Sequence, residues 1–292
     1  MSFERGLFRA AKTIALINQK GGVGKTTTTV NLAASLALAE RRVLVVDFDP
    51  QGNASSAIGL SREAIAAAPT IYQVLLGQSE ATSAIHKTEV DGLDVLAANQ
   101  DLSGAEIELV GMLARESKLK LALESIKANY DFILIDCPPS LGLLTINALT
   151  AADSYFVPLQ CEYFALEGLG QLMNTARLIR MSTNPKLEEE GILLTMYDTK
   201  TNLSSQVANE VRKHLGNKVY ETIIPRNVKL SECSSFGKPI VLYDVNSKGN
   251  AAYLALAKEF LQRNQIETAP TLSTELVHTN TGPEALIPNA SA

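Results

Sequence analysis

A glycine-rich segment near the start of the chain has the residue types of a phosphate-binding loop. It reads Lys20-Gly21-Gly22-Val23-Gly24-Lys25-Thr26-Thr27 and lies between an apolar run and a helix-like stretch. Glycines let backbone N–H groups point at a polyphosphate, Lys25 can reach the β- and γ-phosphates, and the Thr26 hydroxyl can bind Mg²⁺. The common motif has a glycine at position 19, whereas this chain has Gln19 followed by a second lysine, Lys20. The segment therefore predicts a nucleotide site with an additional cation.

Three aspartates stand where apolar, strand-like runs end. Asp47 and Asp49 follow residues 43–46, and Asp136 follows residues 132–135. The carboxyl ends of parallel strands meet at one edge of a sheet, where ligands bind, so these carboxylates should face the phosphate-binding loop. We predict Asp136 near Mg²⁺, through a water molecule, and Asp49 at both the metal and the attacking water. Whether Asp47 takes the second role or only holds its loop stays open.

Apolar, β-branched runs alternate with helical patterns along the first 264 residues. We expect strands at 13–17, 43–46, 93–96, 132–135, 154–158, 192–196 and 219–224, and helices that include 27–39, 117–128, 168–181 and 203–215. Strands that are apolar on both faces and separated by helices form parallel sheets covered on both sides. The prediction is an α/β fold: a doubly wound, mainly parallel sheet flanked by helices on both faces, as in P-loop NTPases.

Composition divides the chain into three parts. Residues 12–264 form the predicted nucleotide-binding domain, residues 1–11 a short lead-in, and residues 265–292 a tail. The tail is polar, contains prolines and has no helical or strand period, so it cannot bury enough apolar surface to offset the entropy of ordering. We expect the tail to be disordered.

The overall composition is that of a globular protein. The chain has 292 residues, of which 46% are hydrophobic and 20% charged, so it can bury a large core. No apolar run reaches the roughly 18 to 20 residues of a membrane span, and the start lacks a signal-peptide pattern, so we expect a cytoplasmic protein. The three cysteines and three histidines are widely spaced, which argues against a disulfide framework and against zinc or iron–sulfur sites.

The net charge of −5 by itself disfavours binding to nucleic acid. The charge is uneven, however, because residues 196–250 carry eight Lys and Arg against five Asp and Glu. An excess of this size is more often a solvated surface than a binding site. Composition alone therefore gives DNA binding little support.

Five segments carry a more specific pattern. They are residues 20–27, Asp47-Phe48-Asp49-Pro50-Gln51-Gly52-Asn53-Ala54, Asp136-Cys137-Pro138-Pro139-Ser140-Leu141-Gly142, Gln160-Cys161-Glu162-Tyr163-Phe164-Ala165-Leu166-Glu167-Gly168 and Ile224-Pro225-Arg226-Asn227. In this order they closely resemble the ParA/Soj chromosome- and plasmid-partitioning ATPases, which have a deviant Walker A loop. The resemblance covers about residues 12–263. It implies Mg²⁺-dependent hydrolysis of ATP.

In that family ATP binding joins two subunits in a sandwich, and the resemblance implies that Lys20 reaches the phosphates of the partner subunit. A cation offered in this way stabilises charge on the transferring phosphoryl group. Catalysis would then rest on Lys20, Lys25 and Asp49, with Thr27 at the α-phosphate. The adenine base would lie against a group of late residues: Met196, Pro225, Arg226 and Asn227.

The same resemblance implies a DNA-bound, nucleoid-associated homodimer whose slow hydrolysis is stimulated by a ParB/Spo0J-type partner. The DNA would be double-stranded and bound without sequence preference, and the positions similar to the family's DNA contacts include Lys200, Arg226 and Lys229. Lysine keeps the charge that neutralises phosphate, and losing the planar fork of arginine matters little when only the DNA backbone is contacted. A dimer also doubles the local positive excess, which removes the objection from net charge.

Related ATPases offer alternatives. A MinD-type positioning ATPase acts on membranes and would need a terminal amphipathic helix with a basic face, but residues 265–292 contain no Lys or Arg. Relatives with iron–sulfur clusters bind metal through paired cysteines, and Cys137 has no second cysteine at a matching spacing. A non-enzymatic nucleotide-gated scaffold would differ only in turnover, and Asp49 favours slow hydrolysis. A chromosomal or plasmid role and the docking site of the partner stay open.

Overall fold

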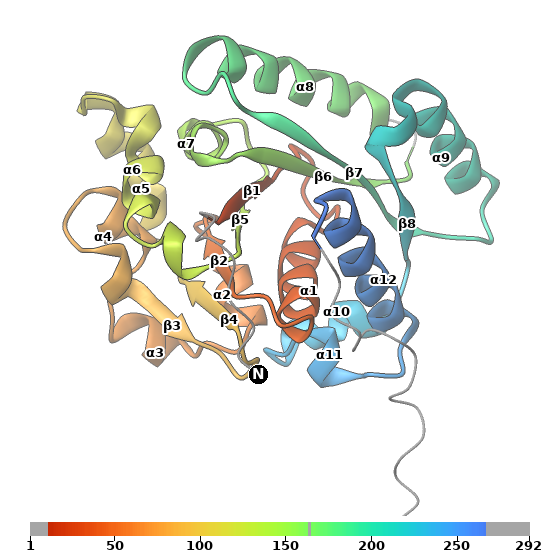
Figure 1. The fold of residues 1–292 in the computed structure, drawn as a ribbon, viewed down its shortest axis with the longest axis horizontal. Helices are drawn as coiled ribbons and strands as arrows, with labels where there is room; N and C mark the ends of the chain where they lie inside the picture. The colour runs from red at the N-terminus through yellow and green to blue at the C-terminus, as the bar shows by residue number, and fades with distance from the viewer. Residues whose placement is uncertain (1–10, 163–164, 267–292) are drawn as a thin grey trace, which may run out of the picture.

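One sheet of eight strands runs through the part of the chain that the computed structural model describes, residues 11–162 and 165–266 (Figure 1). The strands are β1 (Lys12–Leu16), β2 (Val43–Asp47), β3 (Ile85–Lys87), β4 (Leu93–Leu96), β5 (Phe132–Asp136), β6 (Ser154–Gln160), β7 (Glu188–Tyr197) and β8 (Val219–Pro225). Their order is β3-β4-β2-β5-β1-β6-β7-β8, and every neighbouring pair except β3 with β4 is parallel. The predicted mainly parallel sheet is confirmed.

Helices connect the parallel strands, because a chain that must start the next strand at the same edge needs a crossover. The α-helices are α1 (Lys25–Leu38), α2 (Asn53–Ala57), α3 (Arg62–Ala66), α4 (Ile71–Leu75), α5 (Leu102–Glu108), α6 (Lys118–Glu124), α7 (Leu143–Ala151), α8 (Ala165–Ser182), α9 (Asn202–Leu215), α10 (Val228–Ser235), α11 (Ile240–Tyr243) and α12 (Lys248–Arg263). None of the helices in the described residues combines the length and the apolar character that crossing a bilayer requires.

Strand residues alternate between two hydrophobic clusters, one on each face of the sheet. On β1, Ile14 and Leu16 pack with residues of α1, α2 and α12, whereas Ala15 packs with residues of α5, α6, α7 and α8. This period of two residues is that of a strand buried on both faces. Figure 1 shows the result: α1 and α12 lie side by side against one face, and α8 runs along the other.

The carboxyl edge of the sheet brings the predicted site together. β1 lies between β5 and β6, and the chain passes from its carboxyl end into the glycine-rich loop. In the register of the sheet, Asp136 on β5 is opposite both Asp47 on β2 and Leu16 on β1. Crevices at the carboxyl ends of neighbouring parallel strands are where such sheets bind ligands.

The departures of local structure from the predictions include those at α6 and at β3. The helix expected at 117–128 is shorter, because after α6 the chain tightens into 3₁₀ bonds, with Ile126 N–H donating to Leu123 O at 3.1 Å. The antiparallel strand β3 was not predicted, since three residues are too few to show a period. Apart from Ala11, Gln265 and Ile266, the predicted lead-in and tail lie outside the described residues, so the three-part division stays a prediction.

Candidate functional site

The phosphate-binding loop joins β1 to α1 and is open to solvent. Gly22 and Gly24 have φ angles of 74° and 89°, in the left-handed region that favours glycine. A Cβ atom at Gly21 or Gly22 would meet no other atom within 4 Å. Thr28 N–H donates to Gly24 O at 2.9 Å, which starts α1 directly after the loop. The amino end of this helix therefore adds its partial positive charge to a loop that a polyphosphate can approach.

Lys25 is buried within the loop. Only 7% of its surface is exposed, and its Nζ donates to Lys20 O at 3.3 Å. Burial lowers the pKa of Lys25, while the charges of Asp136, Cys137 and Asp49 raise it. A phosphate group would supply the strong negative charge that best compensates the buried ammonium.

The Asp136 carboxylate accepts hydrogen bonds from two threonines of α1. Thr26 Oγ1 donates to Oδ2 at 2.7 Å, and Thr29 Oγ1 donates to Oδ1 at 3.0 Å. Thr29 Oγ1 also lies 3.0 Å from Lys25 O. Sequence reasoning missed Thr29, although its place three residues after Thr26 put both hydroxyls on one side of the helix. Thr29 ties Asp136 to the helix that carries the loop.

Asp47 and Asp49 have different surroundings. Asp47 is fully buried, and its Oδ2 accepts hydrogen bonds from Ser55 N–H at 2.8 Å and from Ser55 Oγ at 2.7 Å. Asp49 is 8% exposed, and its Oδ1 accepts from Gln51 N–H at 3.0 Å. Asp47 therefore holds the loop after β2, whereas Asp49 is slightly less buried and bonds within its own turn.

Burial raises the pKa of the two innermost carboxyl groups. The pKa of Asp47 rises to about 6 and that of Asp136 to about 7, where the charge of Asp47 adds to the effect of burial. Hydrogen bonds from Ser55 to Asp47, and from Thr26 and Thr29 to Asp136, act in the opposite direction. A cation at this edge would favour the ionised form of both groups.

The oxygens at this edge fit Mg²⁺. A hydroxyl, Thr26 Oγ1, and a carboxylate oxygen, Asp136 Oδ2, lie 2.7 Å apart. Mg²⁺ prefers such hard ligands and usually completes its shell with water and substrate phosphates. In the described part of the chain, no group of three or more His, Cys, Asp and Glu could hold a metal on its own. The arrangement therefore suits a metal that arrives with a nucleotide.

Lys20 lies on the outer side of the loop, with 53% of its side chain exposed. Its Nζ forms an ion pair with Glu162, just after β6. Its backbone N–H donates to Asn18 Oδ1 at 3.0 Å, and Asn18 Nδ2 donates to Pro158 O at 2.8 Å. Sequence reasoning did not assign Asn18 or Glu162, although Glu162 stands within one of the five segments. The two lysines of the loop thus differ: one ammonium is buried and the other is accessible.

The residues expected at adenine line one small cavity of about 130 Å³ together with the loop. Thr195 Oγ1 donates to Val23 O at 2.8 Å, which fastens β7 to the loop. The pairing of β7 with β8 then brings position 196 next to positions 225–227. Sequence reasoning missed Thr195 and the buried Tyr253, which also line the cavity. The lining also includes Gly24, Thr27, Met196, Pro225, Arg226 and Asn227.

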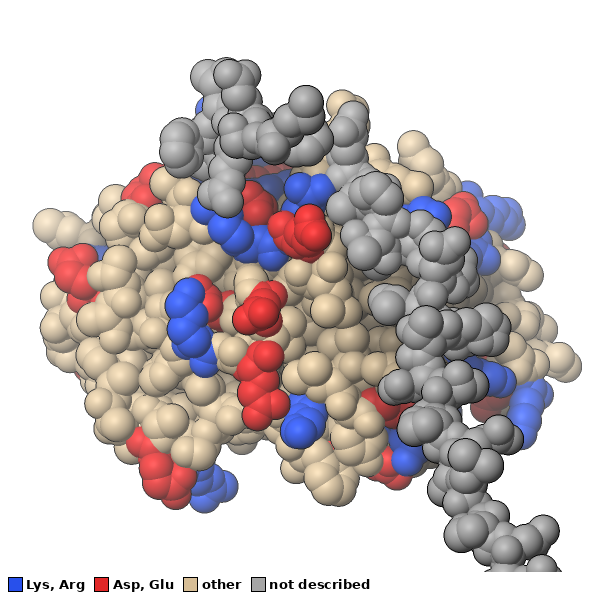
Figure 2. Space-filling model, turned by 60° about the horizontal axis from the view of Figure 1, so that its bottom comes forward, with Lys and Arg blue, Asp and Glu red and all other residues tan. Residues whose placement is uncertain are grey.

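The three residues predicted to contact DNA lie near the ends of β7 and β8. Lys200 follows β7, Arg226 follows β8, and both are exposed. Lys229 lies in the first turn of α10, with its Nζ 2.9 Å from Glu232 Oε2. Part of the charge of Lys229 is therefore balanced within the chain, which sequence reasoning missed. On the face that Figure 2 shows, the visible Lys and Arg side chains are interspersed with Asp and Glu.

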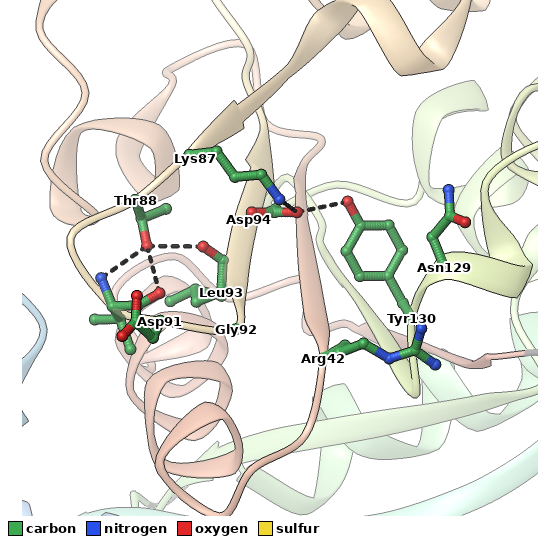
Figure 3. Close-up of a pocket in the computed structure, with 10 residues that line it drawn as sticks. Arg42, Lys87, Thr88, Asp91, Gly92, Leu93, Asp94, Asn129 and Tyr130 are labelled. Carbon is green, nitrogen blue, oxygen red and sulfur yellow. Dashed lines mark hydrogen bonds and ion pairs between the residues drawn. The ribbon is translucent and has the colours of Figure 1, made fainter. Parts of the chain in front are cut away.

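A cavity of about 570 Å³ is larger but lies at the amino-terminal edge of the sheet, opposite the loop (Figure 3). At its centre Asp94 accepts hydrogen bonds from Lys87 Nζ and from the Tyr130 hydroxyl, each at 2.8 Å. Arg42 on its wall is paired with Asp131 at 3.1 Å. Lys87, Asp94 and Arg42 are thus already paired within the chain, and size alone does not identify the site.

Comparisons with known proteins agree with the loop and the fold. The AAA domain family matches residues 11–189. The chromosome partitioning protein ParA of Myxococcus xanthus is 56% identical over 261 residues, which cover 89% of this chain and 92% of that protein. The sporulation initiation inhibitor protein Soj of Bacillus subtilis is 57% identical over 248 residues, covering 85% and 97%.

A solved structure extends the comparison. The crystal structure of cobyrinic acid a,c-diamide synthase from Mycobacterium smegmatis, with bound ADP and magnesium, matches with a TM-score of 0.76 and 38% identity, over 87% of this chain and 96% of that chain. The fold and the loop define the class of the protein as a P-loop ATPase. Within that class, the chain belongs to the ParA/Soj family of chromosome-partitioning ATPases.

Proposed function

We propose that this ATPase is a switch for DNA segregation. ATP and Mg²⁺ bind at the loop, the ATP-bound chain dimerises as a sandwich, and the dimer holds double-stranded DNA without sequence preference. Slow hydrolysis, stimulated by a ParB/Spo0J-type partner, resets the switch. The protein acts in the cytoplasm, where it associates with the nucleoid. The observation that best supports this proposal is that one loop holds a buried lysine, Lys25, and a half-exposed lysine, Lys20. The names of the relatives from M. xanthus and B. subtilis support the same role.

At the nucleotide, different residues of the chain would bind the phosphates, hold the metal and orient the attacking water. Bound Mg²⁺·ATP supplies the phosphoryl group and a cation that neutralises its charge. Lys25 binds the β- and γ-phosphates, and Thr26 and Asp136 hold the metal directly or through water. Thr29 keeps the Asp136 carboxylate in place. Asp49, on a loop fixed by buried Asp47, orients the attacking water.

Lys20 would act on the other subunit. In the single chain it pairs with Glu162, but both side chains are about half exposed, at 53% and 42%. Exposed ion pairs contribute only about 0 to 1 kcal/mol. The phosphates of a nucleotide carry more charge than one carboxylate, so they can draw Lys20 across a dimer interface. The loop then couples ATP binding to dimerisation.

DNA binding would follow from dimerisation. Lys200 and Arg226 are exposed near the ends of β7 and β8, and two subunits present two copies of them. Cations that neutralise DNA phosphates release counterions, so the affinity falls steeply with salt. Lys229 contributes less than these two in our proposal, because Glu232 balances part of its charge.

The test is the ATPase rate with and without duplex DNA and the purified ParB-type partner. We expect low basal turnover that DNA and partner together raise. Asp49→Ala should dimerise on ATP without hydrolysing it. Asp91→Ala, an exposed acid at the opposite edge, is the matched control and should behave as the wild type.

Several outcomes would contradict the proposal. Normal stimulated turnover of Asp49→Ala would move the water-positioning role to another residue. Equal DNA affinity with and without ATP, or affinity insensitive to salt, would exclude the DNA switch. ATP-dependent pelleting with lipid vesicles would favour the MinD-type alternative.

A further inference from the structure

Two buried hydroxyl groups face each other beside the small cavity that the phosphate-binding loop helps to line. Thr28 on α1 and Tyr253 on α12 are 0% and 1% exposed, and their hydroxyl oxygens lie 3.2 Å apart. Tyr253 is one of the residues that line this cavity of about 130 Å³, whereas Thr28 is not. A buried polar pair thus borders the place where we expect adenine.

The pair has one more hydroxyl hydrogen than it uses. Each hydroxyl has one hydrogen to donate, and the bond between them uses only one of the two. Within residues 11–162 and 165–266, neither hydroxyl has a second hydrogen-bond partner. The next residue, Thr29, differs, because its hydroxyl also bonds to Lys25 O at 3.0 Å. A buried donor without a partner is costly, so a ligand atom that accepts the spare hydrogen would gain affinity.

Other polar side chains of the cavity wall are already used by the chain. The Thr195 hydroxyl gives its hydrogen to Val23 O at 2.8 Å. The Asn227 side-chain oxygen accepts from Lys229 N–H at 2.8 Å, where it caps α10. Ser231 also lines the cavity, but it is exposed, so solvent can satisfy its hydroxyl. The spare hydrogen of the buried pair is therefore available to a base in the cavity.

The position of Tyr253 is fixed by the packing of α12. One turn before it, Gly249 lies so close to Leu230 of the cavity wall that a Cβ atom would be 2.7 Å from Leu230 Cγ. Along its length α12 also packs against α1, which follows the loop. At the far end of α12 the ring of Phe260 meets that of Phe132, with centroids 5.3 Å apart. The hydroxyl is thus held in place relative to both the loop and the cavity wall.

We propose that Tyr253 is a specificity-determining residue that donates its hydroxyl hydrogen to a ring nitrogen of adenine. Thr28 donates to the Tyr253 oxygen, which directs the tyrosine hydrogen toward the cavity. The ring nitrogens of adenine that are not bonded to ribose are hydrogen-bond acceptors without a hydrogen of their own, so they suit such a donor. This inference rests on the proposed function, since it assumes that ATP binds at the loop with its base in this cavity.

The test is a double-mutant cycle between Tyr253→Phe and three ATP analogues, 1-deaza-ATP, 3-deaza-ATP and 7-deaza-ATP, which each replace one ring nitrogen by carbon. Affinities come from displacement of a ribose-labelled fluorescent ATP from the full chain in the presence of Mg²⁺. We expect Tyr253→Phe to bind ATP about three- to tenfold more weakly, the range of one neutral hydrogen bond. One analogue should bind the wild type more weakly by a similar factor, and Tyr253→Phe should not weaken that analogue further.

Variants of Thr28 separate a contact with the base from a packing effect. Thr28→Val removes the same internal hydrogen bond as Tyr253→Phe but leaves the tyrosine hydrogen, so its loss of ATP affinity should be smaller. Thr28→Ser keeps the hydroxyl and should resemble the wild type. Tyr220→Phe is the matched control, because the buried Tyr220 hydroxyl donates to Glu190 Oε1 at 3.4 Å near the starts of β7 and β8, at the other edge of the sheet. Urea unfolding shows that each variant folds.

Several results would overturn the role of Tyr253 and leave the proposed function intact. Equal ATP affinity of the wild type and Tyr253→Phe is one. Equal losses in Tyr253→Phe and Thr28→Val, with no deaza analogue coupled to Tyr253, would reduce the pair to packing. Coupling to purine riboside triphosphate, which lacks the amino group of adenine, would show that the hydroxyl accepts rather than donates. If Tyr253→Phe did not fold, equal affinity of the wild type for ATP and all three analogues would still exclude the contact.

Failure of the proposed function gives different results. A wild-type chain that does not bind ATP would contradict the proposed function and this inference with it. A chain in which Tyr253 is coupled to a ring nitrogen, but which binds duplex DNA equally with and without ATP, would contradict the DNA switch and leave the contact with the base established.

Discussion

The Asp47 carboxylate accepts hydrogen bonds from both the backbone N–H and the hydroxyl of Ser55, at 2.8 and 2.7 Å. Both residues are fully buried. The Ser55 hydroxyl also accepts from Ala98 N–H at 3.2 Å, so one side chain joins the end of β2 to the segment after β4. This pair favours a structural role for Asp47 and leaves Asp49 as the better candidate for chemistry.

Replacing Ser55 should therefore destabilise the fold. Ser55→Ala leaves a buried carboxylate short of a partner, which we expect to lower the free energy of unfolding by about 1 to 3 kcal/mol. Ser56→Ala changes an exposed neighbour and should stay within about 0.5 kcal/mol of the wild type. Urea unfolding followed by circular dichroism measures both. Equal stabilities of the two variants would contradict the assigned role of Ser55.

Replacing each of the two lysines of the loop should impair a different step. Lys25→Ala removes a charged donor to phosphate, worth about 1.5 to 3 kcal/mol, so ATP affinity should fall at least about tenfold. Lys20→Ala should keep ATP binding but lose ATP-dependent dimerisation. Lys87→Ala, with its lysine 86% exposed at the opposite edge, is the control. Fluorescent ATP titration and size-exclusion chromatography separate the two effects, and a Lys20→Ala chain that still dimerises would rule out action across the dimer.

Thr29 should position Asp136 for the metal. Thr29→Val keeps the shape of the side chain but removes the hydrogen bond of 3.0 Å to Asp136 Oδ1. Loss of such an outer partner typically costs about tenfold or more in metal affinity or activity. We expect Thr29→Val to need about tenfold more Mg²⁺ for half-maximal ATPase, and Thr29→Ser to resemble the wild type. If Thr29→Val needed the same Mg²⁺ concentration as the wild type for half-maximal ATPase, the role of Thr29 would be packing alone.

The two buried carboxyl groups should make stability depend on pH in the chain without nucleotide and metal. Their pKa values are raised to about 6 for Asp47 and about 7 for Asp136, whereas unfolded aspartates ionise near pH 3.9, so the folded chain binds more protons between these values. Their stabilising contribution is complete below about pH 4 and is lost as the pH rises through about 6 to 7.

Asp136→Asn tests this pH dependence, because its amide does not titrate. The wild type should lose stability relative to Asp136→Asn between about pH 4 and pH 7, as urea unfolding across this range measures. Asp91→Asn, at an exposed site, should follow the wild type. A difference between wild type and Asp136→Asn that does not change with pH would show that Asp136 is ionised throughout.

Much of the fold follows from local patterns. The strands β2, β4 and β5 begin at the predicted residues, because a fully buried parallel strand appears as an uninterrupted apolar run. β7 is longer than predicted at its start, since Glu188, Glu189 and Glu190 do not look like strand residues. Lys218 and Lys12 pair with Glu189 and Glu190, at 2.7 and 2.5 Å, which lets acidic residues begin that strand.

The sequence by itself determined the class of the protein and most of the predicted nucleotide site. Loop residues 20–27 and the acids that end β2 and β5 are recognisable because each lies within a short segment whose spacing reflects its local geometry.

Only the tertiary structure decided the pairings between distant segments. Ser55 is bonded to Ala98, Lys20 to Glu162, and position 196 lies beside positions 225–227. It also decided that Leu109 is buried while Leu113, of the same type, is exposed. Whether a side chain is buried, and which group it bonds to, depend on which elements pack together. Residue type alone does not specify this packing.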